Sequence, residues 1–245
     1  GNPLLRCNVL TINPFRAILD IFLPRTCVVC GRRLRVREDY CCLKCLADLP
    51  YTYYWASRHN PMADRYNEKI TDEDGYATAV ALFFYDSGSG YENITQHLKY
   101  EYGISSGEFF AGLLAEKIKE GGLMANVDTV IPVPLHWKRR RRRGYNQAEV
   151  IASVVAERLG AQLVTGALVR SRNTRTQTEI GMEGKTENVQ GAFTLKSKLQ
   201  GKHILLVDDL FTSGSTLASC QKAIREKNPA RECRISIATL GCVGD

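Results

Sequence analysis

The feature that most constrains the fold of this chain is an apolar run that leads into two adjacent acids and a small polar loop. Residues 204–207 read Ile-Leu-Leu-Val, and Asp208 and Asp209 follow them directly. The loop residues are Thr212, Ser213, Gly214, Ser215 and Thr216. Continuous apolar runs are typical of strands buried on both faces, and the apolar residues after Thr216 recur with helical spacing. The run therefore predicts a strand–loop–helix unit of an α/β fold.

Such a loop is chemically suited to a sugar phosphate. Ligands of open α/β sheets bind at the carboxyl ends of the strands, where this loop would lie. Carboxylates there can accept hydrogen bonds from sugar hydroxyls, and backbone N–H groups at a helix N-terminus can hold a phosphate. The alternative is an ordinary helix cap, in which Asp209 or Thr212 satisfies free N–H groups. The loop lacks a Gly-Lys-Ser/Thr sequence, which disfavours a nucleotide-hydrolysing P-loop.

The order of predicted elements supports an α/β architecture with a mostly parallel sheet flanked by helices. Strands are expected at 78–85, 127–133, 163–169, 203–207 and 234–240, and helices at 91–100, 107–120, 146–159 and 215–227. We expect three parts, namely an N-terminal helix with a cysteine module (1–50), a linker (51–75) and the α/β domain (76–245). The N-terminal helix is expected at 13–24.

The cysteines cluster near the N-terminus with the spacing of a metal site. Cys27 and Cys30 form one Cys-x-x-Cys pair, and Cys42 and Cys45 form a second. Four thiolates at such offsets can close a tetrahedron around a structural Zn²⁺. Cys41 is a competing ligand to Cys42, and a disulfide or a redox pair is the alternative use of the cysteines. The chain shows no signal peptide and no apolar run of the ~18 residues that span a bilayer, so we expect a reducing, cytoplasmic location and no transmembrane segment.

The positive charge of the chain is concentrated in one segment. The formal net charge is +7, and residues 138–143 (Lys-Arg-Arg-Arg-Arg-Arg) alone contribute six cations. The segment follows the strand at 127–133, so it is expected at the carboxyl edge of the sheet. Arg139, Arg140 and Arg143 are candidates to bind a pyrophosphate or DNA, because Arg donates paired hydrogen bonds to oxyanions. A nucleic-acid surface and a plain solvated basic surface are the other interpretations.

Residues 204–216 resemble the phosphoribosyl pyrophosphate (PRPP) fingerprint of type I phosphoribosyltransferases. The resemblance implies that Asp208 and Asp209 hold the ribose hydroxyls and that Thr212 to Thr216 surround the 5-phosphate. It also implies that PRPP is bound with Mg²⁺. The segment 170–193 resembles in position the flexible loop of these enzymes, and Arg172, Arg175 and Gln177 are its candidate site residues. An ordinary surface hairpin is the alternative.

Other segments are similar to the ComF/GntX family of competence-type proteins. They are Pro-Val-Pro-Leu-His at 132–136, Arg-Gly-Tyr-Asn-Gln-Ala at 143–148 and the preceding four-cysteine module. Further matches are His-Leu-Lys-Tyr at 97–100, Arg170 and Arg172 followed by Thr-Gln at 176–177, and Asn-Val-Gln-Gly-Ala-Phe at 188–193. The resemblance extends from about residue 22 to residue 240. Lys185 departs from it, since relatives often carry Arg near this position.

The resemblance implies transfer of ribose 5-phosphate from PRPP to an acceptor, with release of pyrophosphate. The sequence identifies no acceptor, and we assign no catalytic residue, because His97 and His136 are general-base candidates by residue type alone. The alternative is a non-enzymatic protein that binds PRPP or single-stranded DNA during DNA uptake. The sequence does not indicate an oligomeric state.

Overall fold

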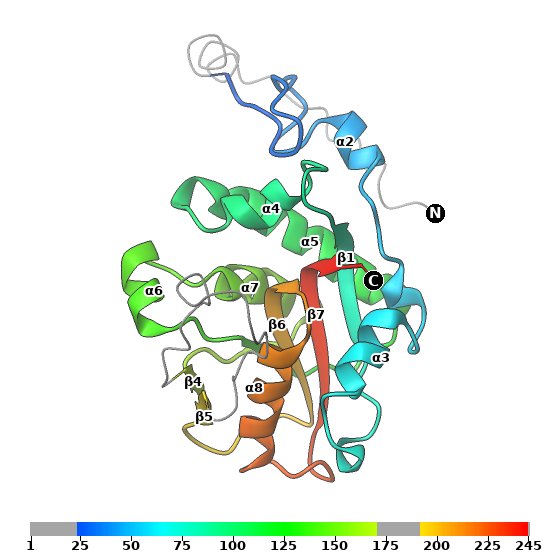
Figure 1. Cartoon of the computed structure of the whole chain (residues 1–245), viewed down its shortest axis with the longest axis vertical. Helices are drawn as coiled ribbons and strands as arrows, with labels where there is room; N and C mark the ends of the chain where they lie inside the picture. The colour runs from blue at the N-terminus through cyan, green and yellow to red at the C-terminus, as the bar shows by residue number, and fades with distance from the viewer. Residues whose placement is uncertain (1–23, 171–191, 245) are drawn as a thin grey trace, which may run out of the picture. The chain divides into compact units, whose positions relative to one another are not determined.

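A computed structural model describes residues 24–170 and 192–244, in two compact units that divide between Leu49 and Pro50 (Figure 1). Of the helix expected at 13–24, residues 13–23 lie outside the described part. The flexible-loop candidates Arg172, Arg175 and Gln177 also lie outside it. Among the described helices, none has the length and apolar character needed to cross a membrane.

The first unit is a small module built around its cysteines. A turn at Gly31 (φ 70°) brings Thr26 and Arg33 together in an antiparallel bridge. A short helix, α2 (Leu43–Ala47), then carries the second cysteine pair, with Cys42 as its N-cap residue. The Sγ atom of Cys42 accepts a hydrogen bond from the backbone N–H of Cys45, so the metal-ligand spacing and the helix cap coincide.

The second unit contains a five-stranded parallel sheet, which confirms the predicted fold class. The strand order is β1-β7-β6-β2-β3, and every pair is parallel. The strands are β1 (Ala79–Tyr85), β2 (Thr129–Pro132), β3 (Gln162–Leu163), β6 (His203–Phe211) and β7 (Arg234–Val243). The central strands are almost wholly buried, which explains why 204–207 reads as a continuous apolar run.

Helices cover both faces of the sheet (Figure 1). Apolar side chains of α3 and α8 share one core cluster with Ile204, Leu206 and Ile237 of the sheet, whereas α5 and α7 contact the other face. The helices are α3 (Pro61–Asn67), α4 (Glu92–His97), α5 (Ile104–Gly121), α6 (Trp137–Arg143), α7 (Gln147–Leu159) and α8 (Ser215–Arg225). The described part of this unit also contains the 3₁₀ turns η2 (Tyr54–Ala56), η3 (Asp72–Asp74) and η4 (Glu101–Gly103).

The structure corrects the interpretation of residues 51–75 as a linker. This segment belongs to the second unit and carries α3, whose Met62, Ala63 and Tyr66 are fully buried in the core. The Tyr66 hydroxyl donates to Oε1 of Gln221 on α8 at 2.8 Å. The polar composition misled the prediction because Met62, Ala63 and Tyr66 share this short amphipathic helix with the polar residues Asp64, Arg65 and Asn67.

Two further elements differ from the prediction. The expected strand 163–169 is broken at Gly166 (φ 71°) into β3 and β4 (Leu168–Arg170), and β4 pairs antiparallel with β5 (Phe193–Leu195) outside the main sheet. Strand β6 does not end at Val207 but continues to Phe211 alongside β7. Leu210 lies beside Gly241, where a Cβ would come within 2.9 Å of Leu210 Cδ1, so the missing side chain makes room for the extension.

Candidate functional site

A cavity of about 310 Å³ lies at the carboxyl ends of β1, β2 and β6. It gathers residues from distant segments, namely Tyr85, Lys99, Arg139, Arg143, Arg170, Asp208, Asp209 and Thr216. A larger cavity of about 490 Å³ beside α3 and α8 lacks the paired acids and the arginines of α6. We therefore take the smaller cavity as the candidate site, because it combines adjacent acids with several cations.

Asp208 and Asp209 both line this cavity and are half-buried at the end of β6. The backbone N–H of Asp209 donates to Oδ1 of Asp208 at 2.9 Å. Burial raises the pKa of Asp208 well above its usual range, and the neighbouring Asp209 carboxylate raises it further. Burial also raises the pKa of Asp209, although the charges of Lys99 and Arg143 oppose this shift. The pair therefore depends on surrounding cations, or on a bound ligand that donates hydrogen bonds, to stay ionised.

The loop that follows β6 ends at the N-terminus of α8. Gly214 is the N-cap residue, with a left-handed φ of 76°, and no side chain caps this helix end. The alternative interpretation of Asp209 or Thr212 as the cap is therefore wrong. Ser213 Oγ and Ser215 Oγ lie 3.0 Å apart, and only Thr216 of the five predicted phosphate residues lines the cavity. The backbone N–H of Ser215 donates a long hydrogen bond to Ser213 Oγ at 3.4 Å, and among the described residues no side chain accepts from the N–H groups of Thr216 or Leu217. A phosphate would complete such an arrangement.

We expect Gly214→Ala to destabilise the protein. A left-handed conformation costs a residue with a Cβ about 1–2 kcal/mol, and this Cβ would lie 2.8 Å from Cε2 of Phe211. Chemical denaturation should show a loss of at least that size. Gly112→Ala on α5 is the matched control, because a Cβ there meets nothing within 4 Å and should leave stability equal or higher. Equal stability of both variants would contradict the assigned role of Gly214.

The basic segment is the short helix α6, not an irregular loop. His136 accepts from the backbone N–H of Lys138 at its start, and Gly144 (φ 83°) ends it. Arg139 and Arg143, four residues apart, line the cavity, whereas Arg140 points elsewhere and pairs with Glu149 at 3.3 Å. Burial and the charge of Arg139 lower the pKa of Arg143, and Asp209 opposes this shift.

Two cations of the cavity were not predicted as site residues. Lys99 follows α4 and Arg170 ends β4, so neither belongs to the segments that carry the acids or the arginine run. The positive charge of Arg170 opposes the rise in the pKa of Asp208. Both residues fall within segments that match the ComF/GntX pattern. This match was the sequence signal by which they could have been recognised as site residues. The imidazoles of His97 and His136 do not line the cavity.

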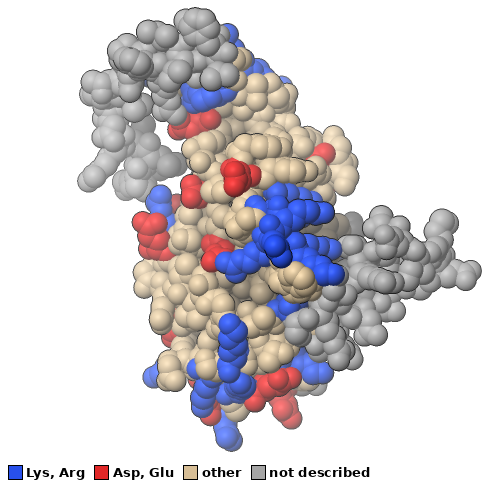
Figure 2. Space-filling view, turned by 90° about the vertical axis from the view of Figure 1, so that its left-hand side faces the viewer, with Lys and Arg blue, Asp and Glu red and all other residues tan. Residues whose placement is uncertain are grey.

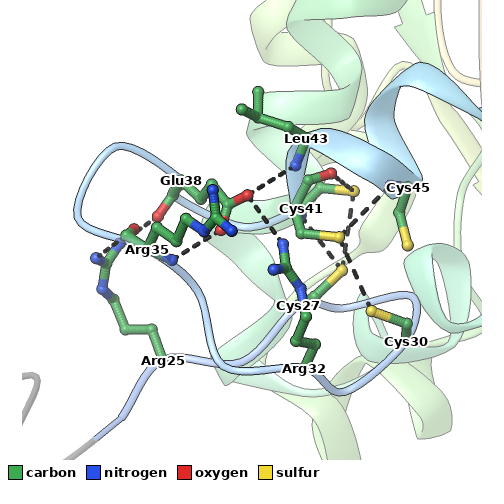
Figure 3. Close-up of polar contacts among 10 residues, drawn as sticks. Arg25, Cys27, Cys30, Arg32, Arg35, Glu38, Cys41, Leu43 and Cys45 are labelled. Carbon is green, nitrogen blue, oxygen red and sulfur yellow. Dashed lines mark hydrogen bonds and ion pairs between the residues drawn. The ribbon is translucent and has the colours of Figure 1, made fainter.

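The four predicted metal ligands come together in the first unit. Figure 3 shows three of them, Cys27, Cys30 and Cys45, with their sulfur atoms close together. The Sγ atoms of Cys27, Cys30, Cys42 and Cys45 all lie within 4.8 Å of one another, so this cluster could hold a metal ion. Burial opposes ionisation of Cys42, but the backbone N–H of Cys45 and the Arg32 guanidinium outweigh it and lower the pKa of Cys42 to about 6. Thiolates are the ligand form, and four sulfurs are the donor set of structural zinc sites.

Cys41 lies beside the cluster but outside the set of four. Its Sγ is 4.0 Å from Sγ of Cys27, and burial raises the pKa of its thiol. The loop that presents the cysteines is held by the buried carboxylate of Glu38, which accepts from the backbone N–H groups of Arg35 (2.7 Å) and Leu43 (2.9 Å) (Figure 3). Arg32 also donates to Glu38 at 3.0 Å.

Comparison with known proteins agrees with the fold of the second unit. The model of the phosphoribosyl transferase domain matches residues 145–241, which include β6, its acids and α8. The fold and this match define the second unit as a phosphoribosyltransferase-like domain.

Relatives of the chain are named for competence and DNA utilization. DNA utilization protein YhgH of Escherichia coli O157:H7 is 34% identical over 103 residues, which cover 42% of this chain and 45% of that protein. Competence protein F of Haemophilus influenzae is 24% identical over 209 residues, or 82% of this chain and 90% of that protein. Competence protein ComFC of Bacillus subtilis is 30% identical over 104 residues, which cover 41% of this chain and 40% of that protein. The match thus spans less than half the length of two of these relatives. Together with the domain, these relatives support a ComF-family phosphoribosyltransferase-like protein.

Proposed function

We propose that the protein binds PRPP with Mg²⁺ in the cavity at the end of β6 and transfers its ribose 5-phosphate to an acceptor. The proposal rests chiefly on one observation, namely that adjacent acids, an uncapped helix N-terminus and two arginines of α6 surround one cavity. In it, Asp208 and Asp209 accept hydrogen bonds from the ribose hydroxyls. The loop at Thr212 to Thr216 holds the 5-phosphate, and Arg139 and Arg143 hold the pyrophosphate.

The transfer step would break one bond and form another at C1 of the ribose. A nucleophilic atom of the acceptor bonds to C1, and the bond from C1 to the pyrophosphate oxygen breaks with its electron pair. Positive charge develops on the sugar and negative charge on the leaving pyrophosphate. Arg139 and Arg143 stabilise the leaving group, and the ionised aspartates stabilise the sugar. Mg²⁺ bound to PRPP would supply further charge neutralisation.

We expect the Arg139→Gln, Arg143→Gln double variant to bind PRPP and Mg²⁺ at least about 100-fold more weakly, since hydrogen bonds to charged groups are worth roughly 1.5–3 kcal/mol each and one is lost at each arginine. Titration calorimetry would measure this loss, and release of pyrophosphate in the presence of nucleobases would test transfer. Affinity for ribose 5-phosphate, which lacks the pyrophosphate, should change little. Arg141→Gln with Arg142→Gln removes the same charge outside the cavity and should leave PRPP affinity nearly unchanged. Equal losses in the two double variants would contradict the assignment.

A second candidate function is binding of single-stranded DNA during DNA uptake. The observation that favours it is the outward face of α6, because Arg140, Arg141 and Arg142 are exposed and do not line the cavity. The names of the relatives point to the same process. In this proposal the arginines contact DNA phosphates, and their affinity falls steeply with salt as counterions are released.

We propose that the four-cysteine cluster holds a structural Zn²⁺. The four sulfurs leave no ligand position open for chemistry, so the ion would stabilise the first unit without taking part in transfer. The site requires reduced thiols, which is consistent with the cytoplasmic location that we expect.

A further inference from the structure

Helix α6 divides its cations between two surfaces. Arg139 and Arg143 line the cavity, and the other arginines of the helix face solvent. Among the described residues, none forms an ion pair with Arg141 or Arg142. Figure 2 shows a dense group of Lys and Arg side chains on the side of the molecule where α6 lies. These outward cations are not accounted for by a ligand in the cavity.

Exposed aromatic rings occur at both ends of this basic helix. Trp137, its first residue, is 57% exposed. Tyr100 and Tyr102 are 57% and 70% exposed, and their rings are nearly parallel, with centroids 5.5 Å apart and an interplanar angle of 3°. These three rings account for half of the most exposed large hydrophobic residues that the described part of the chain contains.

Contacts place the tyrosine pair beside the C-terminal end of α6. The Tyr145 hydroxyl donates to the carbonyl of Leu98 at 2.7 Å, which joins the segment after α6 to the segment before the tyrosines. A Cβ on Gly144 would lie 3.9 Å from Oε1 of Glu101, the residue between Tyr100 and Tyr102. Since a helix of this length extends only about 10 Å, the tyrosines and Trp137 flank one continuous basic surface.

We propose that this surface binds single-stranded nucleic acid, with phosphates along Arg141 and Arg142 and unstacked bases on Tyr100, Tyr102 and Trp137. The inference rests on the second candidate function above and assigns residues to it. Alternation of cations with exposed rings is what single-strand sites require, because every base has a face that can stack on an aromatic ring. The carboxylate of Glu101 repels phosphates, so the backbone follows α6 while the bases reach the tyrosines. A duplex keeps its bases stacked internally and could use only the arginines.

Fluorescence anisotropy with an oligothymidylate tests the proposal on the full chain. We choose a length of about 16 nucleotides, because a single-strand-binding domain covers up to about that many. We expect Tyr100→Ala with Tyr102→Ala to weaken binding about tenfold, or about 1.4 kcal/mol, the loss of one good stack. The dependence of affinity on salt should stay the same. Arg141→Gln with Arg142→Gln should instead reduce the slope of log affinity against log salt by about 1.4, or 0.7 for each phosphate contact.

Two control variants keep the result specific to stacking. Tyr100→Phe with Tyr102→Phe retains the rings and should bind as the wild type does. Tyr53→Ala removes another exposed tyrosine (65%) of the same unit and should also leave affinity unchanged. A strand of abasic sites should bind the wild type and the Tyr→Ala variant equally, as should a duplex.

The outcomes separate this inference from the functions on which it builds. If the wild type binds the oligothymidylate and the Tyr→Ala variant binds it equally tightly, the aromatic site is refuted while DNA binding stands. If the wild type does not bind it, both are refuted. PRPP affinity, measured by calorimetry on the same variants, should not change in either case, because none of the altered side chains lines the cavity.

Discussion

The Asp208→Asn, Asp209→Asn double variant is expected to lose measurable binding of PRPP and Mg²⁺. The two carboxylates line the cavity at the end of β6, and each would accept hydrogen bonds from a ribose hydroxyl. Such charge-assisted bonds are worth roughly 1.5–3 kcal/mol each, so losing one at each acid weakens binding by at least about 100-fold. Titration calorimetry of the wild type and the variant measures this directly.

The loss should not come from unfolding. Burial raises the folded-state pKa of both acids. Their contribution to stability is therefore fully present below the unfolded pKa and is lost as pH rises through the folded pKa. Above the folded pKa values the ionised pair therefore destabilises the fold, and there the Asn variant should melt at an equal or higher temperature. Because the pKa of both acids is raised, they become protonated at a higher pH than an ordinary aspartate does. On acidification, PRPP binding by the wild type should therefore begin to weaken at that higher pH.

A matched control removes the same two charges elsewhere. Glu116→Gln with Glu120→Gln alters exposed side chains of α5 that lie outside the cavity, and PRPP affinity should stay within about twofold, the scale of long-range effects that salt screens. An Asp208→Asn, Asp209→Asn protein that binds PRPP as tightly as this control would contradict the assigned role of the acid pair.

The second large effect concerns the metal. We expect Cys42→Ser to reduce zinc from about one ion per chain to almost none and to unfold the first unit, since structural zinc contributes about 10–16 kcal/mol in small domains. Metal analysis by mass spectrometry and limited proteolysis within residues 24–49 would measure both changes. PRPP affinity should persist, because every residue that lines the cavity belongs to the second unit.

Cys41→Ser is the control for the zinc site. Cys41 is adjacent in sequence and buried, but it lies outside the set of four sulfurs, so the variant should retain its zinc. Retention of zinc by Cys42→Ser together with its loss from Cys41→Ser would show that Cys41 is the ligand instead.

The strand–loop–helix unit around Asp208 could be predicted because its information is local. An apolar run, two acids and a glycine-containing loop are read in order along the chain, and the strand and helix lie where the pattern predicts them. The continuation of β6 to Phe211 could not be predicted, because it depends on pairing with β7 and on the space that Gly241 leaves for Leu210. Burial of α3 was missed for a similar reason, since its partner Gln221 is distant in sequence.

The residues of the cavity could likewise be predicted only where the sequence pattern is local, and not where their position depends on the tertiary fold. Arg139 and Arg143 were predicted from the basic run, but their separation from Arg140 follows from helical periodicity. Six successive cations repel one another and show no apolar pattern, so the basic run itself does not indicate a helix. The helix begins at His136, whose side chain accepts from the backbone N–H of Lys138, and ends at Gly144 with its left-handed φ of 83°. Lys99 and Arg170 reach the acids only because α4 and β4 lie at the same edge of the sheet.

The most direct test of the PRPP proposal is an electron-density map of crystals soaked with PRPP and Mg²⁺. The proposal predicts the ribose hydroxyls within hydrogen-bonding distance of Asp208 and Asp209, with the 5-phosphate on the backbone N–H groups at the start of α8. It also places the pyrophosphate against Arg139 and Arg143. Density for PRPP bound elsewhere, or an empty cavity at saturating PRPP, would contradict it.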